Sequence, residues 1–351
     1  MSAPSSAPDL DDAEGLAAAD RDGLLRAVAT AGASVRAVAA TAAEGGLDAL
    51  RDSRPRSVVW ISGRGTAGTA GALLAAGWGA TSVAPIAPAS GVPPWVGPLD
   101  VVVVAGDDPG DPALVAAASG AVRRGARVVV AAPFEGPLRD ATAGRAAVLA
   151  PRLWLPDAFN LSRYLAVGLV TLAAVDPVGG VDVAALADAL DAEALRNAPA
   201  AEMFTNPAKA LAQRLSGDPA VLTADSAALL AVARHGSATL LRIAGAAVPA
   251  AELPDVVTAS RDGMLATARA VTDIFHDDEL DGPRPGRTRV LALAARDERA
   301  VVAARLAAVP DVDFLDVDEA DTVVRGDHEP AVLAVRLEMA AVYLRLLRSP
   351  V

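Results

Sequence analysis

The residues best suited to bind a ligand form a glycine-rich loop that follows an apolar run. Gly63-Arg-Gly65-Thr-Ala-Gly68 fits the pattern G-x-G-x-x-G and comes after residues 57–62, a β-branched run that favours a strand. Such a loop brings backbone N–H groups and a helix start towards an anion. Dinucleotide binding also needs an acidic residue about 20 positions later, and none lies between Asp52 and Asp100. The loop therefore indicates sugar or phosphate binding, or a tight turn without a ligand, rather than a nicotinamide cofactor.

A second candidate loop is acidic. It reads Ala105-Gly-Asp-Asp-Pro-Gly-Asp111, so that three carboxylates follow a predicted strand. A phosphate dianion beside these carboxylates would meet like-charge repulsion. Asp111 precedes Pro112 and is explained as a helix N-cap. The spacing fits no standard calcium loop, so we predict no metal site and no cofactor.

Three histidines are the remaining candidates for acid–base chemistry. We expect His235 at the end of a helix and His328 in a surface loop. His276 lies among carboxylates, which favours a solvated acidic turn over a base with its orienting partner. No two histidines share metal-ligand spacing. The chain has no cysteine, which excludes disulfides and thiolate chemistry.

The elements that position these loops alternate between apolar strands and helices. Strands are predicted at residues 57–62, 81–86, 99–105, 126–132, 146–150, 219–223, 288–293 and 312–317. Continuous apolar strands of this kind favour parallel sheets that are covered on both faces. We therefore predict an α/β protein with two three-layer αβα domains of the flavodoxin type, leading helices and a closing C-terminal helix. The expected divisions are a disordered tail (1–15), N-terminal helices (16–54), a first domain (55–155), a helical connector (156–204) and a second domain (205–351).

Composition restricts the partners. The formal net charge is −12 and only 3% of residues are aromatic. Nucleic-acid binding needs a basic footprint, which this sequence lacks. The first eight residues lack the pattern of a signal peptide, and the longest apolar run, near residues 165–175, is too short to span a bilayer. The sequence thus predicts a soluble cytoplasmic protein without a nucleic-acid or membrane partner.

Five short segments together resemble one protein family. The glycine loop resembles the GxGGS-type loop that opens the SIS fold in bifunctional phosphoglucose/phosphomannose isomerases. Four further segments are similar to that family and occur in the family's order: Glu135–Ala141, Thr205–Leu211, Leu253–Asp255 and Ala341–Leu344. The resemblance runs from about residue 55 to the C-terminus, and it implies a sugar phosphate as the ligand.

The resemblance also implies roles for particular residues. Arg139 matches the arginine that holds the negative charge developing on the enediolate, although an ordinary loop arginine paired with Asp140 is an equal alternative. The residues expected to bind the substrate are Gly63, Arg64, Gly65, Thr66, Gly106 and Asp107. The family places its active site at a subunit interface, which implies a homodimer. The leading helices and the closing helix are the expected dimer surfaces.

Other positions depart from the family's pattern. The acidic loop replaces a Ser/Thr-rich phosphate loop, residues 241–247 lack the family's catalytic carboxylate, and residues 256–260 lack its histidine. The family's C-terminal lysine has no counterpart, since Lys209 belongs to another segment. Glu252 or Asp255 remains open as a substitute for the base. We therefore expect a sugar-phosphate-binding protein with weak or no isomerase activity. An active aldose–ketose isomerase and a non-catalytic partner subunit of sugar-nucleotide metabolism are the alternatives.

Overall fold

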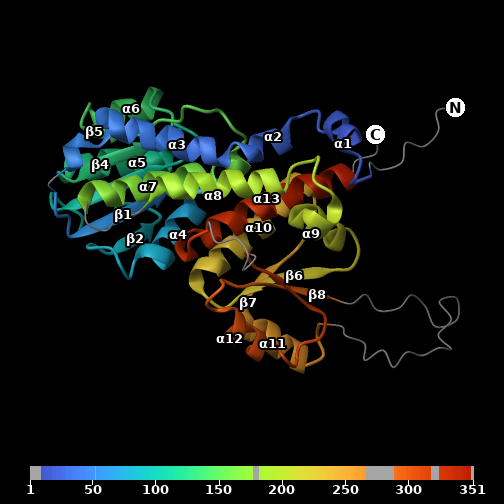
Figure 1. Cartoon of the computed structure of the whole chain (residues 1–351). Coiled ribbons are helices and arrows are strands. Elements are labelled where there is room, and N and C mark those ends of the chain that lie inside the picture. Colours follow the sequence, from blue (N-terminus) through green and yellow to red (C-terminus); the bar gives the residue numbers. More distant parts are fainter. Residues whose placement is uncertain (1–8, 52, 177–181, 266–287, 318–323, 349–351) are drawn as a thin grey trace, which may run out of the picture. The chain divides into compact units, whose positions relative to one another are not determined.

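The computed structural model describes residues 9–51, 53–176, 182–265, 288–317 and 324–348. The chain divides into two compact units, which are residues 26–195 and residues 1–25 together with 196–351. Figure 1 labels the elements and colours them along the chain. The predicted domain boundaries stay predictions.

The unit of residues 26–195 is built on a five-stranded parallel sheet. Its strands are β1 (Ser57–Ser62), β2 (Ile86–Ala89), β3 (Asp100–Ala105), β4 (Arg127–Ala131) and β5 (Ala146–Val148), in the order β2-β1-β3-β4-β5. Every residue of β3 is buried, as expected for a sheet covered on both faces.

The strand predicted at residues 81–86 is wrong for all but its last residue. The N–H groups of Thr81 and Ser82 both hydrogen-bond to the carbonyl of Trp78, at 3.2 and 2.9 Å. These residues therefore close the turn after the preceding helix, and the strand begins only at Ile86.

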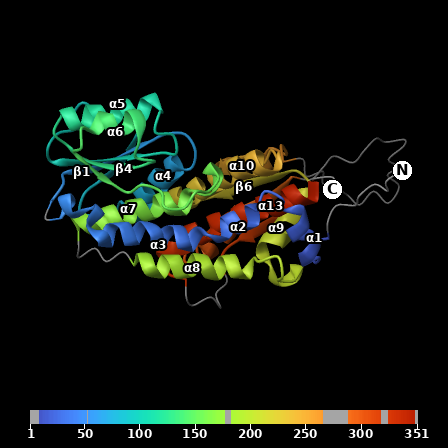
Figure 2. The same ribbon diagram turned by 90° about the horizontal axis from the view of Figure 1, so that it is seen from above.

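Helices cover both faces of this sheet (Figure 2). One face carries α4 (Ala67–Trp78), with α7 (Leu161–Val175) and α3 (Ala31–Thr41) packed beside it, and the other carries α5 (Pro112–Arg123) and α6 (Gly136–Thr142). The remaining helices that begin in this unit or at its boundary are α2 (Leu24–Ala29) and α8 (Val183–Arg196).

Close contact between α4 and β1 depends on small residues. The indole of Trp60 on β1 donates from Nε1 to the carbonyl of Ala67 at 2.8 Å. A Cβ on Gly71 would lie 2.8 Å from that same nitrogen and would overlap the ring. The helix backbone thus lies directly on the tryptophan, which is how a core poor in aromatic residues still packs densely.

The other unit contains a four-stranded parallel sheet. Its strands are β6 (Ala220–Ala224), β7 (Ala250–Glu252), β8 (Arg289–Leu293) and β9 (Val312–Leu315), in the order β7-β6-β8-β9. The helices of this unit are α1 (Ala13–Ala19), α9 (Pro207–Ser216), α10 (Ala227–Ala244), α11 (Leu253–Arg261), α12 (Arg299–Arg305) and α13 (Glu329–Arg348). In Figure 1, α9, α10 and α13 lie on one side of the sheet and α11 and α12 on the other.

Numbered within its own unit, each sheet has the strand order 2-1-3-4, and the first sheet adds a fifth strand at its edge. The predicted fold class, two three-layer αβα domains with parallel sheets and with leading and closing helices, is confirmed. The closing helix α13 packs against α9 and α10, and Ala341–Leu344 are fully buried. That helix is therefore not the exposed dimer surface that the sequence suggested. In the part of the chain that is described, no helix is long and apolar enough to cross a membrane.

The segment Asn206-Pro-Ala-Lys209 starts α9. The Asn206 side chain caps the helix by accepting from the N–H of Lys209 at 2.9 Å, and Pro207 takes the first helical position. The fully buried Lys209 donates from Nζ to the carbonyls of Pro199 and Ala201, both at 2.7 Å. This segment therefore has a structural role, because Lys209 holds the turn that contains Pro199 and Ala201 against the start of α9.

Candidate functional site

The first sheet has a topological switch point between β1 and β3. In this strand order the helices that follow the two strands, α4 and α5, lie on opposite faces of the sheet. The loops at the carboxyl ends of such a pair leave a crevice, where open α/β sheets bind their ligands. Residues 63–66 and 106–111 form these two loops, so the two segments selected from sequence meet at one place.

Glycines let the loops approach each other. The N–H of Gly63 donates to the carbonyl of Ala105 at 2.8 Å. A Cβ on Gly106 would lie 2.6 Å from Leu114 Cδ1 and 3.6 Å from Gly63 Cα. Gly65 has φ +87°, a conformation that favours glycine, and a Cβ there would lie 3.4 Å from Asp107 Oδ2.

Asp107 is the centre of a polar cluster. Its Oδ1 accepts from Tyr164 Oη at 2.7 Å and from Asn160 Nδ2 at 2.9 Å, and lies 3.5 Å from Arg163 Nη2. The three donors come from the start of α7, where Asn160 is the N-cap residue. Sequence analysis missed them. The available signal was polar side chains at spacings of three and four residues in an otherwise apolar helix.

The cluster is buried but incomplete. The Arg163 side chain is 5% exposed, and its Nε and Nη1 have no hydrogen-bond partner among the described residues. Asp107 Oδ2 is likewise buried without a partner in the described part of the chain. Unmade hydrogen bonds of buried charged groups are costly. A donor-rich cation and an acceptor thus lie side by side with capacity for further hydrogen bonds.

Burial sets the ionisation of the cluster. It raises the pKa of Asp107, and this effect exceeds the lowering caused by the hydrogen bond from Tyr164 and by the charge of Arg163. Burial also raises the pKa of the Tyr164 phenol. Tyr164 therefore stays protonated at neutral pH and remains the donor in its bond to Asp107.

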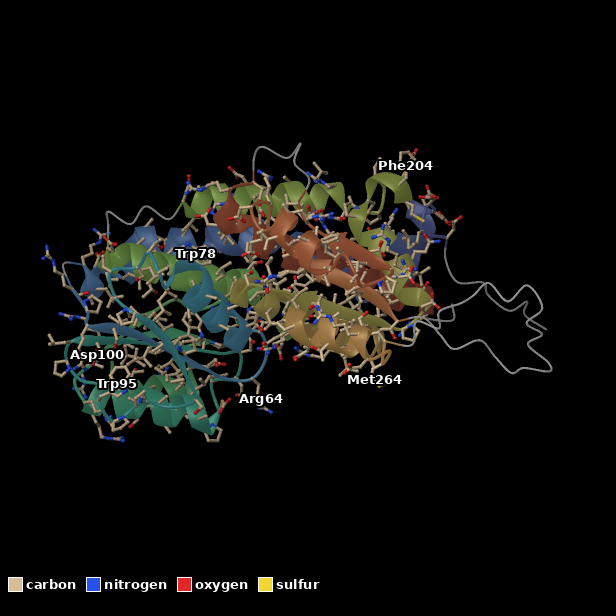
Figure 3. All side chains as sticks on the ribbon, turned by 90° about the horizontal axis from the view of Figure 1, so that it is seen from below. Arg64, Trp78, Trp95, Asp100, Phe204 and Met264 are labelled. Atoms are coloured by element: carbon tan, nitrogen blue, oxygen red, sulfur yellow. The ribbon has the colours of Figure 1, made fainter. Side chains whose placement is uncertain are left out.

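The other aspartates of the acidic loop have partners within the protein. Asp108 accepts from the N–H of Gly110 at 2.8 Å and pairs with Arg64 at 3.2 Å. Arg64 is 85% exposed, and Figure 3 shows its side chain extending outward from the loop. Asp111 caps α5 by accepting from the N–H of Ala113 at 2.9 Å, as predicted. Within the described ranges, no group of three or more His, Cys, Asp or Glu side chains could hold a metal ion.

The remaining predicted site residues differ in their placement. Thr66 precedes α4 and donates from Oγ1 to the carbonyl of Asp157 at 3.4 Å, which links the glycine loop to the segment before α7. Arg139 lies on α6, is 61% exposed and pairs with Asp140 at 3.6 Å. That contact is the one expected of a surface arginine, and the catalytic role of Arg139 stays a prediction.

Two predictions about histidines are wrong. His235 lies in the middle of α10, since the helix continues to Ala244, and its Nε2 is 2.7 Å from Glu338 Oε1 in a buried pair. His328 is fully buried rather than on the surface. Both belong to the unit that contains the second sheet. His276 lies outside the described residues.

Comparison with solved structures identifies the architecture. A protein from Clostridium difficile assigned as a phosphosugar isomerase has TM-score 0.64 at 12% identity, with 93% of this chain and 94% of that one covered. Tagatose-6-phosphate ketose/aldose isomerase from Escherichia coli has TM-score 0.61 at 13% identity, with 99% and 94% covered. The chain has an SIS-like fold.

A third similar structure is a domain of an aminotransferase. The C-terminal domain of glucosamine-fructose-6-phosphate aminotransferase from Francisella tularensis has TM-score 0.61 at 10% identity, covering 93% of this chain and 98% of that domain. Neither a protein-family model nor a curated protein sequence matches this chain. The likeness is therefore one of fold, and the function has to be argued from the site.

Proposed function

We propose that the chain binds a sugar phosphate, or a related carbohydrate derivative, at the β1/β3 switch point, with weak or no isomerase activity. One observation carries this proposal. The buried Arg163 has two nitrogen atoms without a partner among the described residues, and the adjacent Asp107 has one such oxygen. Both groups lie at the switch point, which is where this class of sheet binds ligands.

The unsatisfied groups suit a sugar hydroxyl. A hydroxyl both donates and accepts, so one such group can accept from Arg163 while it donates to Asp107 Oδ2. A phosphate at the same point would face the Asp107 carboxylate and be repelled. The sugar ring thus belongs beside Asp107, and the phosphate elsewhere in the crevice.

The start of α4 is the better position for the phosphate. Its N-cap residue Thr66 makes no side-chain capping bond, and the first turn carries no acidic residue. Uncapped N–H groups at a helix start attract anions. The start of α5 is already capped by Asp111. Gly63, Arg64, Gly65 and Thr66 would then surround the phosphate.

Weak or absent turnover follows from the groups near the site. Aldose–ketose isomerisation needs a base that moves a proton between adjacent carbons and an acid that opens the ring. Residues 26–195 contain no histidine. The hydrogen bonds from Tyr164 and Asn160 to Asp107 Oδ1 favour its charged form and so weaken it as a base.

One observation favours an active isomerase as the second candidate. Asp107 is a carboxylate at the switch point whose pKa is raised by burial, and perturbed carboxylates of this kind often mark catalytic bases. In that case Asp107 would move the proton and Arg163 would hold the enediolate oxygen.

A ligand screen with an activity assay tests the proposal. Thermal unfolding would be followed with glucose 6-phosphate, fructose 6-phosphate and mannose 6-phosphate, and coupled isomerase assays would use the same samples. A ligand at 100 times its Kd should add about 2.7 kcal/mol of stability. We expect stabilisation without appreciable turnover. Turnover that is lost in Asp107→Asn would favour the isomerase, and silence in both assays would favour a non-catalytic partner subunit.

A further inference from the structure

The unit with the second sheet contains an arginine-lined pocket of about 620 Å³. It lies at the carboxyl ends of β8 and β9, whose following residues form part of its wall. Five of its lining residues are arginines and one is an aspartate, Asp316. The arginines are Arg196, Arg214, Arg296, Arg299 and Arg336. This concentration of positive charge stands out in a chain of net charge −12.

The structure holds several of these guanidinium groups in fixed positions. Arg336 is 6% exposed and donates from Nη1 to the carbonyl of Asp316 at 2.6 Å. Arg299 donates from Nε to the Asp316 carboxylate at 2.7 Å, and its guanidinium carbon lies 3.3 Å from the centre of the Phe314 ring. Fixed guanidinium groups lose little further entropy when they bind an anion.

Two further carboxylates among the described residues lie at long ion-pair distances from arginines of the pocket. Asp313 is shared between Arg289 at 2.8 Å and Arg214 at 4.0 Å, outside the hydrogen-bonding range of the second. Glu329 pairs with Arg296 at 3.7 Å. Burial raises the pKa of Glu329, and nearby Asp297 and Asp316 raise it further.

We propose that this pocket binds a small organic molecule with two or more phosphate groups. Its arginines come from several elements, α9, α12 and α13 among them, and line one cavity. The cavity is in the size range of small-molecule sites. Guanidinium forks match phosphate oxygens with paired hydrogen bonds.

Binding of pyrophosphate to the full chain tests the site, with ADP and fructose 1,6-bisphosphate as organic probes and citrate as a polycarboxylate of comparable charge. Calorimetry should show pyrophosphate and at least one organic phosphate binding at low salt, with citrate weaker, and binding should weaken as ionic strength rises. Citrate that binds as tightly as every phosphate, or no binding by any phosphate, would overturn the proposal.

Matched variants locate the binding. Arg214→Gln should weaken pyrophosphate binding about ten- to a hundredfold, the equivalent of a lost hydrogen bond to a charged group. Arg214→Lys should weaken it less, since the charge remains. Arg234 on α10 has a comparable weak ion pair, 3.7 Å from Glu252, and is outside the pocket. The Arg234→Gln variant should therefore bind pyrophosphate with the affinity of the unchanged protein.

The variant Gly65→Ala tests this site independently of the proposed sugar-phosphate site. The change should leave pyrophosphate binding intact even if it abolishes sugar-phosphate binding. Equal losses in Arg214→Gln and Arg234→Gln would show that the effect is one of total charge, which would overturn the assignment to this pocket.

Discussion

At the scale of single residues, Asp100 shows how a buried charge is stabilised. It lies at the start of β3, next to Trp95 in Figure 3. It is fully buried, and its carboxylate accepts from Arg56 at 2.6 Å, from Ser57 at 2.9 Å and from the N–H of Gly97 at 2.8 Å. Burial alone would raise the pKa of Asp100, but these contacts together lower it.

Asp100→Asn tests that balance through its dependence on pH. A lowered pKa in the folded state gives stability that is present above the unfolded value, about 3.9, and is lost as pH falls through the folded value. The variant should lower the free energy of unfolding by about 1–3 kcal/mol at pH 7. Urea unfolding should show this difference narrowing towards pH 3.

The exposed Asp48, paired with Arg51 at 2.9 Å, provides the comparison. Asp48→Asn should change stability by less than about 1 kcal/mol. A difference for Asp100→Asn that stays constant between pH 7 and pH 3 would contradict a charge-based role.

The candidate site shows what residue patterns reveal and what they miss. The glycine loop and Asp111 could be predicted because their signals are local: a spacing of glycines after a strand, and an aspartate before a proline. Arg163 and Tyr164 could not, since more than 50 residues separate them from Asp107 and only the packing of α7 brings them there. His235 was misplaced because Gly236 follows it and resembles a helix end, whereas α10 continues through Gly236 to Ala244.

At the scale of elements, α4 offers a matched pair of glycines. Gly71 faces Trp60, whereas a Cβ on Gly77 would meet nothing within 4 Å. Gly77→Ala should raise the free energy of unfolding by up to about 1 kcal/mol through helix propensity. Gly71→Ala should lower it by about 1–3 kcal/mol through overpacking. Denaturant unfolding measures both, and equal effects would contradict the close helix–strand contact.

The start of α9 gives a second test at this scale. Lys209→Met removes two hydrogen bonds from a charged donor and leaves the carbonyls of Pro199 and Ala201 without it. The free energy of unfolding should fall by about 2–4 kcal/mol. Gln213→Met, at an exposed position of the same helix, should be nearly neutral. If both changes had similarly small effects on the free energy of unfolding, the structural role assigned to Lys209 would be contradicted.

Most of the order of helices and strands could be predicted from the sequence, because buried parallel strands are continuous apolar runs. β7 was missed since it has only three residues, none of them strongly strand-forming. The strand predicted at 81–86 was wrong because the N–H groups of Thr81 and Ser82 bond to the carbonyl of Trp78 at the end of α4. Strand propensity does not include such a contact.

At the scale of the whole molecule, one unit is continuous and the other contains both chain ends. Residues 26–195 hold a complete five-stranded sheet with its helices. This segment expressed alone should fold and unfold cooperatively, as circular dichroism would show on heating. A fragment without cooperative unfolding would contradict its independence.

Residues 196–351 contact the N-terminal segment that belongs to the same unit. The N–H of Met203 donates to Asp11 at 2.8 Å, and Arg345 pairs with Asp22 at 2.5 Å. The fragment 196–351 should therefore be less stable to heat than the same fragment with residues 1–25 attached. The homodimer implied by the resemblance stays a prediction for sedimentation velocity to test.

The most direct test of the proposed function is calorimetric titration of Gly65→Ala with the best sugar phosphate from the screen. A Cβ at this position would fill the space beside Asp107 Oδ2. Gly144 is the control, since it has φ +71° in the same unit and a Cβ there would meet nothing within 4 Å. Both variants should lose about 1–2 kcal/mol of stability through left-handed strain. We predict that only Gly65→Ala loses affinity, by at least tenfold, and unchanged affinity in Gly65→Ala would contradict a carbohydrate site at the switch point.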